Sequence, residues 1–224
     1  MLSLRVIDTE TCGLQGGIVE IASVDVINGK ITNPMSDLVC PDRPITPQAT
    51  YVHRITEAMV KDKPPIEQLI ERYHGSHYYV AHNAQFDRKM LPEMHGEWIC
   101  TMKLARQLWP GRRYSNQALR EDLELDVTPP DDLHAHRALY DCYVTTALLI
   151  RIMEVSAYDP LTMVRLCQPA TAAVSTLPFG KYRGYPIKEI AEREPRYLHW
   201  MLNNIPTLTP GLRRELESGL RDES

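Results

Sequence analysis

Two carboxylates stand two residues apart, at the end of an apolar run near the start of the chain. Residues 2–7 are typical of a buried strand, and Asp8 and Glu10 follow them directly. Alternate residues of a strand point to one face, so the two side chains should project together. Two acids repel each other unless a cation lies between them, and paired oxygen ligands suit Mg²⁺ or Mn²⁺ rather than zinc. This stretch alone is equally compatible with a strand that ends in two solvated acids.

Two more carboxylates occupy comparable places later in the chain. Asp87 is expected in the first turn of a helix that runs to Met94, just after a short apolar strand at residues 78–81. Asp141 is expected near the start of a long helix, and His136 precedes it. Carboxylates from three distant segments could converge on two divalent cations. Such a pair can activate a water, hold the attacked phosphate and stabilise the leaving 3′ oxygen.

Three short motifs carry a resemblance to a known enzyme family. DTET at Asp8–Thr11, HNAQFD at His82–Asp87 and HRALYD at His136–Asp141 resemble, in this order, the three exonuclease motifs of the DEDDh family. The resemblance covers about residues 1–155. It implies a ribonuclease-H-like fold and the removal of nucleotides one at a time from 3′ ends with two Mg²⁺ ions, for which Mn²⁺ can substitute. It also implies four metal ligands, namely Asp8, Glu10, Asp87 and Asp141.

The same resemblance makes His136 the general base. Imidazole titrates near neutral pH and can take a proton from a water at the metal site. His134 is a competitor, but the family's spacing to the last aspartate selects His136. The offset between His136 and Asp141 does not place them on one helical face. We therefore expect His136 in the lead-in or the first turn of the helix.

Residues beside the motifs are candidates for contact with the substrate. Residues similar to Asn83 and Phe86 touch the terminal nucleotide in the family, and Phe86 could either stack on a base or belong to the core. Leu14 could be an exposed apolar finger against the last base pair, with Gln15 beside it, or a loop residue folded inward. Thr11 could offer its backbone or hydroxyl to the 3′ end.

A strip of basic residues lies in the middle of a chain that carries a net charge of −4. Between Thr101 and Arg120 every charged residue is basic: Lys103, Arg106, Arg112, Arg113 and Arg120. Arg112 and Arg113 could hold backbone phosphates on the approach to the site. A solvated helix face is the alternative.

The order of the expected elements indicates a mixed α/β sheet flanked by helices. Residues 18–27 and 31–39 flank an Asn-Gly pair, so the chain should open as a three-stranded meander. Short strands at residues 78–81 and 98–100 are each followed by helical stretches. A long amphipathic helix is expected over residues 136–153. The resemblance adds the ribonuclease-H-like arrangement to this α/β class.

We expect three parts: an exonuclease domain over residues 1–155, a linker over 156–177 and a small C-terminal α+β domain over 178–224. A short helix could form within the linker near residues 160–166. The small domain should open with a tight hairpin, FGKYRG, at Phe179–Gly184. Its cations and aromatics would suit nucleic-acid binding. For the aromatic residues Phe179, Tyr182 and Trp200 we favour a place in the small core.

The stretches DTETCGLQGGIVEIASVDV, EWICTMKLARQLWPG and FGKYRG resemble a bacterial branch of the family that carries such a C-terminal domain. That branch implies a 3′-to-5′ exodeoxyribonuclease acting on single-stranded DNA and on duplex 3′ ends, including mismatched ones, in DNA repair. An exoribonuclease trimming RNA 3′ ends is the alternative, because the metals act on phosphate in both nucleic acids. A non-catalytic nucleic-acid-binding module is a third possibility. It would be expected to have lost metal-ligand or general-base residues, and all five of these positions are retained.

Composition fits a cytoplasmic protein without a membrane partner; protein partners are not indicated. The chain is 43% hydrophobic and 24% charged. It shows no basic leader before an apolar run and no uninterrupted apolar stretch of about 18 residues. Its five cysteines include no C-x-x-C pair, so we expect reduced thiols and no structural zinc.

Overall fold

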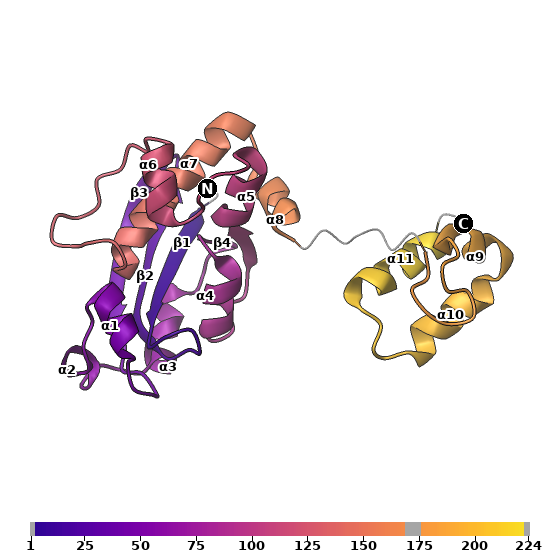
Figure 1. Ribbon diagram of the computed structural model, residues 1–224, viewed down its shortest axis with the longest axis horizontal. Coiled ribbons are helices and arrows are strands. Elements are labelled where there is room, and N and C mark those ends of the chain that lie inside the picture. The colour runs from indigo at the N-terminus through magenta and orange to yellow at the C-terminus, as the bar shows by residue number, and fades with distance from the viewer. Residues whose placement is uncertain (1–2, 169–175, 222–224) are drawn as a thin grey trace. The chain divides into compact units, whose positions relative to one another are not determined.

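The computed structural model describes residues 3–168 and 176–221, which belong to two compact units, Met1–Cys167 and Gln168–Ser224 (Figure 1). Within the described residues, none of the helices is both long enough and apolar enough to span a membrane.

The first unit is built on a five-stranded sheet in the order β3-β2-β1-β4-β5. β1 to β3 form an antiparallel meander, whereas β4 is parallel to β1 and β5 is parallel to β4. Asn28 and Gly29 both adopt positive φ, 51° and 73°, as a tight type I′ hairpin requires. The predicted meander and mixed sheet are therefore confirmed. The strands are β1 (Leu4–Thr11), β2 (Ile18–Ile27), β3 (Lys30–Leu38), β4 (Tyr78–Ala81) and β5 (Glu97–Cys100).

Helices pack against this sheet. The longest, α7 (Ala138–Ser156), lies across β1, β2 and β3 (Figure 1). It buries a stripe at helical spacing, formed by Ala138, Cys142, Thr145, Leu149 and Ile152. The remaining helices of this unit are α1 (Pro47–His53), α2 (Glu57–Val60), α3 (Ile66–Leu69), the 3₁₀ helix η1 (Ile70–Tyr73), α4 (Ala84–Met90), α5 (Thr101–Leu108), α6 (Asn116–Asp122) and α8 (Pro160–Cys167).

Several expected boundaries differ from the structure, among them those of the long helix, expected over residues 136–153 and found at Ala138–Ser156. The helix after the second motif ends at Met90 rather than Met94, because Leu91 is extended ahead of Pro92, a conformation that proline imposes on the residue before it. The expected linker, residues 156–177, differs in its first half, because the first compact unit extends to Cys167. Its helix α8 packs against β5 and places Met163 in the main core.

The second unit has a core of its own, formed by Leu177, Ile187, Ile190, Ala191, Leu198, Met201, Leu208, Leu212 and Leu216. These residues come from α9 (Ile187–Arg193), α10 (Pro195–Asn204), α11 (Pro210–Arg221), the segment between α10 and α11, and, for Leu177, the segment before α9. The predicted hairpin closes through Leu177, whose N–H donates to the Tyr185 carbonyl at 2.9 Å. Our prediction that Phe179 and Trp200 join the core was wrong: their exposed fractions are 40% and 51%.

Candidate active site

Three of the four predicted ligands form one cluster. Ligand oxygens of Asp8, Glu10 and Asp141 all lie within 4.8 Å of one another. Asp8 and Glu10 come from one face of β1, as the period of a strand dictates. Asp141 lies in the first turn of α7, and that helix packs on β1. Folding thus brings together carboxylates that the sequence separates by more than half the chain.

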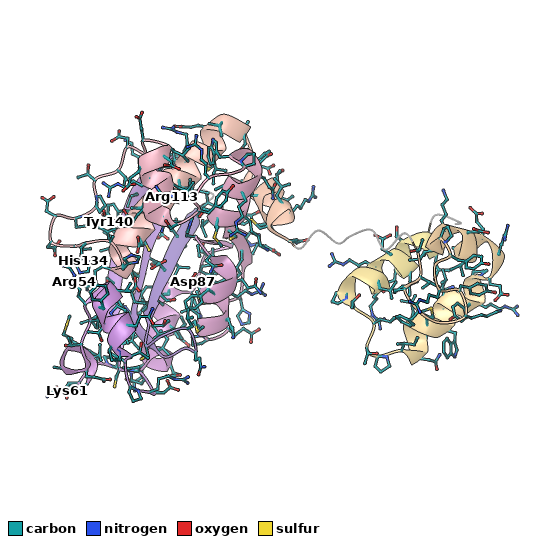
Figure 2. All side chains as sticks on the ribbon, viewed as in Figure 1. Arg54, Lys61, Asp87, Arg113, His134 and Tyr140 are labelled. Atoms are coloured by element: carbon teal, nitrogen blue, oxygen red, sulfur yellow. The ribbon has the colours of Figure 1, made fainter. Side chains whose placement is uncertain are left out.

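Asp87 lies outside this group of three but close enough to influence it. β4 pairs in parallel with the first half of β1, and α4, which begins just after β4, contacts β1. Asp87 is buried, with 3% of its surface exposed, and its Oδ1 accepts a hydrogen bond of 3.0 Å from the Thr9 hydroxyl. In the view of Figure 2, Asp87 is on the α4 side of the strands, whereas His134 and Tyr140 are on the other side.

Burial of these like charges disfavours their ionised forms. It raises the pKa of Glu10 to about 9, with the charges of Asp141, Glu20 and Asp87 adding to the effect. Burial also raises the pKa of Asp87 to about 7, against the opposing hydrogen bond from Thr9. The pKa of Asp8 is raised well above its usual range by burial and by its acidic neighbours. A divalent cation would reverse this balance, and an all-oxygen donor set is what Mg²⁺ and Mn²⁺ prefer. The residues therefore fit the implied metal.

His136 is placed where the sequence predicted, in the lead-in to α7. Its backbone is left-handed, with φ of 67°, and its side chain is exposed. Its N–H donates to Asp141 Oδ2 at 3.0 Å, so the base candidate is tied to one of the clustered carboxylates. The competitor His134 is half-buried, and its Nδ1 lies 2.7 Å from the carbonyl of Ala135, the next residue.

A buried ion pair that the sequence analysis missed supports the His136 segment. Glu20 on β2 is 1% exposed, and both of its oxygens accept hydrogen bonds from the Arg137 guanidinium, at 2.6 and 2.9 Å. It also accepts the Ala138 N–H at 3.0 Å, which caps the start of α7. The available signal was an acidic residue in a largely apolar strand, which Glu20 shares with Asp25.

A cleft of about 670 Å³ opens beside Glu10, and Thr11, Leu14 and Gln15 are among the residues that line it. Leu14 is 87% exposed, so the inward-folded alternative is wrong. His53 contacts the start of the loop that carries Leu14. Its ring Nδ1 accepts the Ile55 N–H at 3.0 Å. Its Nε2 therefore carries the proton and lies 3.2 Å from the Thr11 carbonyl.

The other predicted substrate contacts are less closely tied to the cluster. Asn83 is exposed just before α4, and Phe86 is half-buried, so both alternatives for this aromatic stay open. Arg112 is engaged with Asp122, 3.6 Å from a carboxylate oxygen. Arg113 is exposed and, among the described residues, has no ion pair within 4.0 Å.

Comparison with known proteins decides the family. An exonuclease family model matches residues 6–149, and a model of the exodeoxyribonuclease X-like C-terminal region matches residues 177–205. The chain belongs to the exonuclease family. It is 61% identical over 219 residues to exodeoxyribonuclease 10 of Escherichia coli K12, covering 98% of this chain and 99% of that one.

A more distant relative and a solved structure are also similar to the chain. The DNA polymerase III epsilon subunit of Pasteurella multocida is 36% identical over 146 residues, or 54% of this chain and 57% of that protein. A structure of exonuclease X in complex with 5′ overhanging duplex DNA has a TM-score of 0.72 and 69% identity, over 73% of this chain and 98% of that chain. The predicted ribonuclease-H-like fold and the enzyme class, a 3′-to-5′ exonuclease of DEDDh type, are confirmed. The family generally uses divalent metal ions.

Proposed function

We propose that the chain removes nucleotides one at a time from DNA 3′ ends, both single-stranded and duplex, including mismatched ends. The observation that carries the proposal is the cluster of Asp8, Glu10 and Asp141, with the His136 backbone bonded to Asp141. The DNA preference is supported by the similarity to exodeoxyribonuclease 10 and by the duplex DNA bound to its solved relative.

In this proposal Asp8, Glu10, Asp87 and Asp141 hold two Mg²⁺ ions. When bound, the ions would supply Lewis-acid activation of water and stabilise charge on the phosphodiester. His136 acts as the general base, and its exposed ring leaves it free to accept a proton from the attacking water. The Glu20–Arg137 pair and the bond to Asp141 fix the backbone on both sides of this ring.

The cleft beside Glu10 would receive the 3′-terminal nucleotide. Leu14 lines this cleft and its apolar side chain is exposed, so it can pack on the last base pair of a duplex, with Gln15 beside it. Thr11, Asn83 and Phe86 would contact the terminal nucleotide. Arg113 would hold a backbone phosphate further along the strand, with Arg112 as a second cation near it.

We also propose a role in DNA repair and a cytoplasmic location. Removal of a mismatched 3′-terminal nucleotide is a reaction that DNA repair requires. All five cysteines are free thiols, including Cys100 and Cys167, where the Cys100 N–H lies 3.1 Å from the Cys167 sulfur. Five reduced thiols suit a reducing compartment.

The test uses 5′-labelled single-stranded DNA, duplex DNA with a mismatched 3′ end, and single-stranded RNA, each with and without Mg²⁺. We expect a ladder that shortens from the 3′ end on both DNAs, requires Mg²⁺ and is lost with His136→Ala. His95→Ala is the matched control, because this histidine is 84% exposed and is not part of the described cluster. Preference for RNA would replace the DNA assignment with the exoribonuclease alternative. Failure to degrade any substrate would leave a nucleic-acid-binding module.

A further inference from the structure

The second unit carries a continuous row of four aromatic rings on its surface. The ring centroids of Tyr185 and Tyr182 are 5.9 Å apart, those of Tyr182 and Tyr197 are 5.1 Å apart, and those of Tyr197 and Trp200 are 6.0 Å apart. The two end members are open to solvent, with 52% of Tyr185 and 51% of Trp200 exposed. We call Tyr182, Tyr185, Tyr197 and Trp200 the aromatic row.

The backbone is built to hold this row in place. Tyr197 and Trp200 are three residues apart on α10 and so share one helical face. The Tyr197 hydroxyl accepts the Lys181 N–H at 3.0 Å, which docks the hairpin onto α10. Gly180 has φ of +85°, and a side chain there would collide with the same hydroxyl. The row is therefore a fixed surface feature, whereas the unit's core is aliphatic.

The charges around the row favour an anionic partner. Residues 176–205 contain five Lys or Arg against three Glu, in a chain whose net charge is −4. Two of the glutamates are already paired, Glu194 with Lys181 at 3.2 Å and Glu189 with Arg193 at 2.7 Å. The exposed cations that remain are Arg183, Lys188 and Arg196.

We propose that the aromatic row binds single-stranded DNA. Bases would stack on the exposed rings of Tyr185 and Trp200, and the three cations would meet the phosphates; aromatic platforms beside basic side chains bind single strands in this way. The identification of the strand as DNA rests on the proposed function. A second binding site on the same chain raises the effective concentration of substrate at the active site. The row should therefore govern KM on single-stranded substrates and leave kcat unchanged.

The test measures binding of a fluorescein-labelled single-stranded DNA to the full chain by anisotropy, in EDTA so that hydrolysis does not occur. Trp200→Ala and Tyr185→Ala should each raise Kd about ten-fold, within the range measured for loss of one base–aromatic stack. Trp200→Phe, which keeps a ring, should largely retain affinity. Leu161→Ala is the matched control, because Leu161 is a 47% exposed apolar residue of the first unit. Thermal melts of every variant check folding.

Activity at varied DNA concentration separates this proposal from the proposed function. We expect Trp200→Ala to raise KM on single-stranded DNA with kcat retained. Unchanged Kd and KM in both alanine variants would overturn the binding role of the row, even in a fully active exonuclease. Conversely, a chain that binds through the row without degrading DNA would refute the proposed function alone.

Discussion

Removing the Glu20 carboxylate should both destabilise the first unit and slow the reaction. Glu20→Ala leaves the Arg137 guanidinium without its partner and the Ala138 N–H without its cap. Breaking a buried ion pair by removing one partner costs about 3–5 kcal/mol. Because the Arg137 side chain is 20% exposed and can regain some water, we expect a loss near the lower end, about 3 kcal/mol.

The effect on activity comes from the position of His136. With the Arg137 side chain released, the lead-in to α7 loses its anchor to β2 and keeps two backbone N–H bonds, from His136 to Asp141 Oδ2 and from Arg137 to the His134 carbonyl. A displacement of about 1 Å in a reacting group can cost on the order of 100-fold in rate, so we expect kcat to fall 10- to 100-fold while KM changes little. If Glu20 acts through His136, then adding Glu20→Ala to a His136→Ala variant should cost almost no further activity.

The assay combines denaturant unfolding with steady-state degradation of labelled DNA. Arg72→Ala is the control, because Arg72 makes a comparable ion pair with Asp37 at 2.8 Å but is 54% exposed; such pairs contribute about 1 kcal/mol or less. The reasoning is refuted if Glu20→Ala unfolds like the Arg72 variant and keeps its kcat. Equal losses of activity from Glu20→Ala in the wild-type and His136→Ala backgrounds would refute the positioning role separately.

Three further predictions concern the cluster and its loop. Without divalent cations, the folded-state pKa values of Glu10 (about 9) and Asp87 (about 7) lie above their ordinary values. The stability that these groups contribute below about pH 4 is therefore lost as pH rises towards 9. Calorimetry should show that Tm falls over this window and that Mg²⁺ raises Tm more at pH 9 than at pH 5. Thr9→Val removes the hydroxyl that donates to the buried Asp87 carboxyl and should cost about 1–3 kcal/mol in unfolding free energy, whereas an unchanged value would contradict the contact. Gly17→Ala should destabilise more than Gly29→Ala in the same unfolding assay, because both have positive φ but only the Gly17 Cβ would meet a side-chain atom, at 2.9 Å; equal losses would show that the clash is absent.

Local rules were sufficient to predict much of the cluster. The two-residue period of a strand places Asp8 and Glu10 on one face, whereas the approach of Asp87 and Asp141 was expected only as a possible convergence of three segments. The resemblance supplied the metal and base roles of the cluster residues. That His136 precedes the helix followed from its offset to Asp141, and the structure starts α7 at Ala138. These are features that neighbouring residues and strand order determine.

The same rules could not predict contacts between residues that are far apart in the sequence. The sequence displays Glu20 and Arg137 but gives no reason to pair them across more than a hundred residues. The same holds for Met163 of α8, whose burial depends on the position of β5. Trp200 was misjudged because apolar character was taken to mean burial, whereas the aliphatic residues of three helices already fill the small core.

Two glutamates that face each other across β1 and β2 illustrate how the fold separates stability from chemistry. Glu10 and Glu20 are direct partners in the antiparallel register and therefore lie on one face of the sheet. Glu20 is satisfied by Arg137, the Ala138 N–H and the Ser36 hydroxyl. Glu10 instead adjoins two other carboxylates, and burial together with the neighbouring acidic charges raises its pKa to about 9. The protein thus stabilises one carboxylate with its own cation, and in the proposed function the other would bind an ion from solution, which would make metal binding and the retention of the active-site geometry parts of one equilibrium.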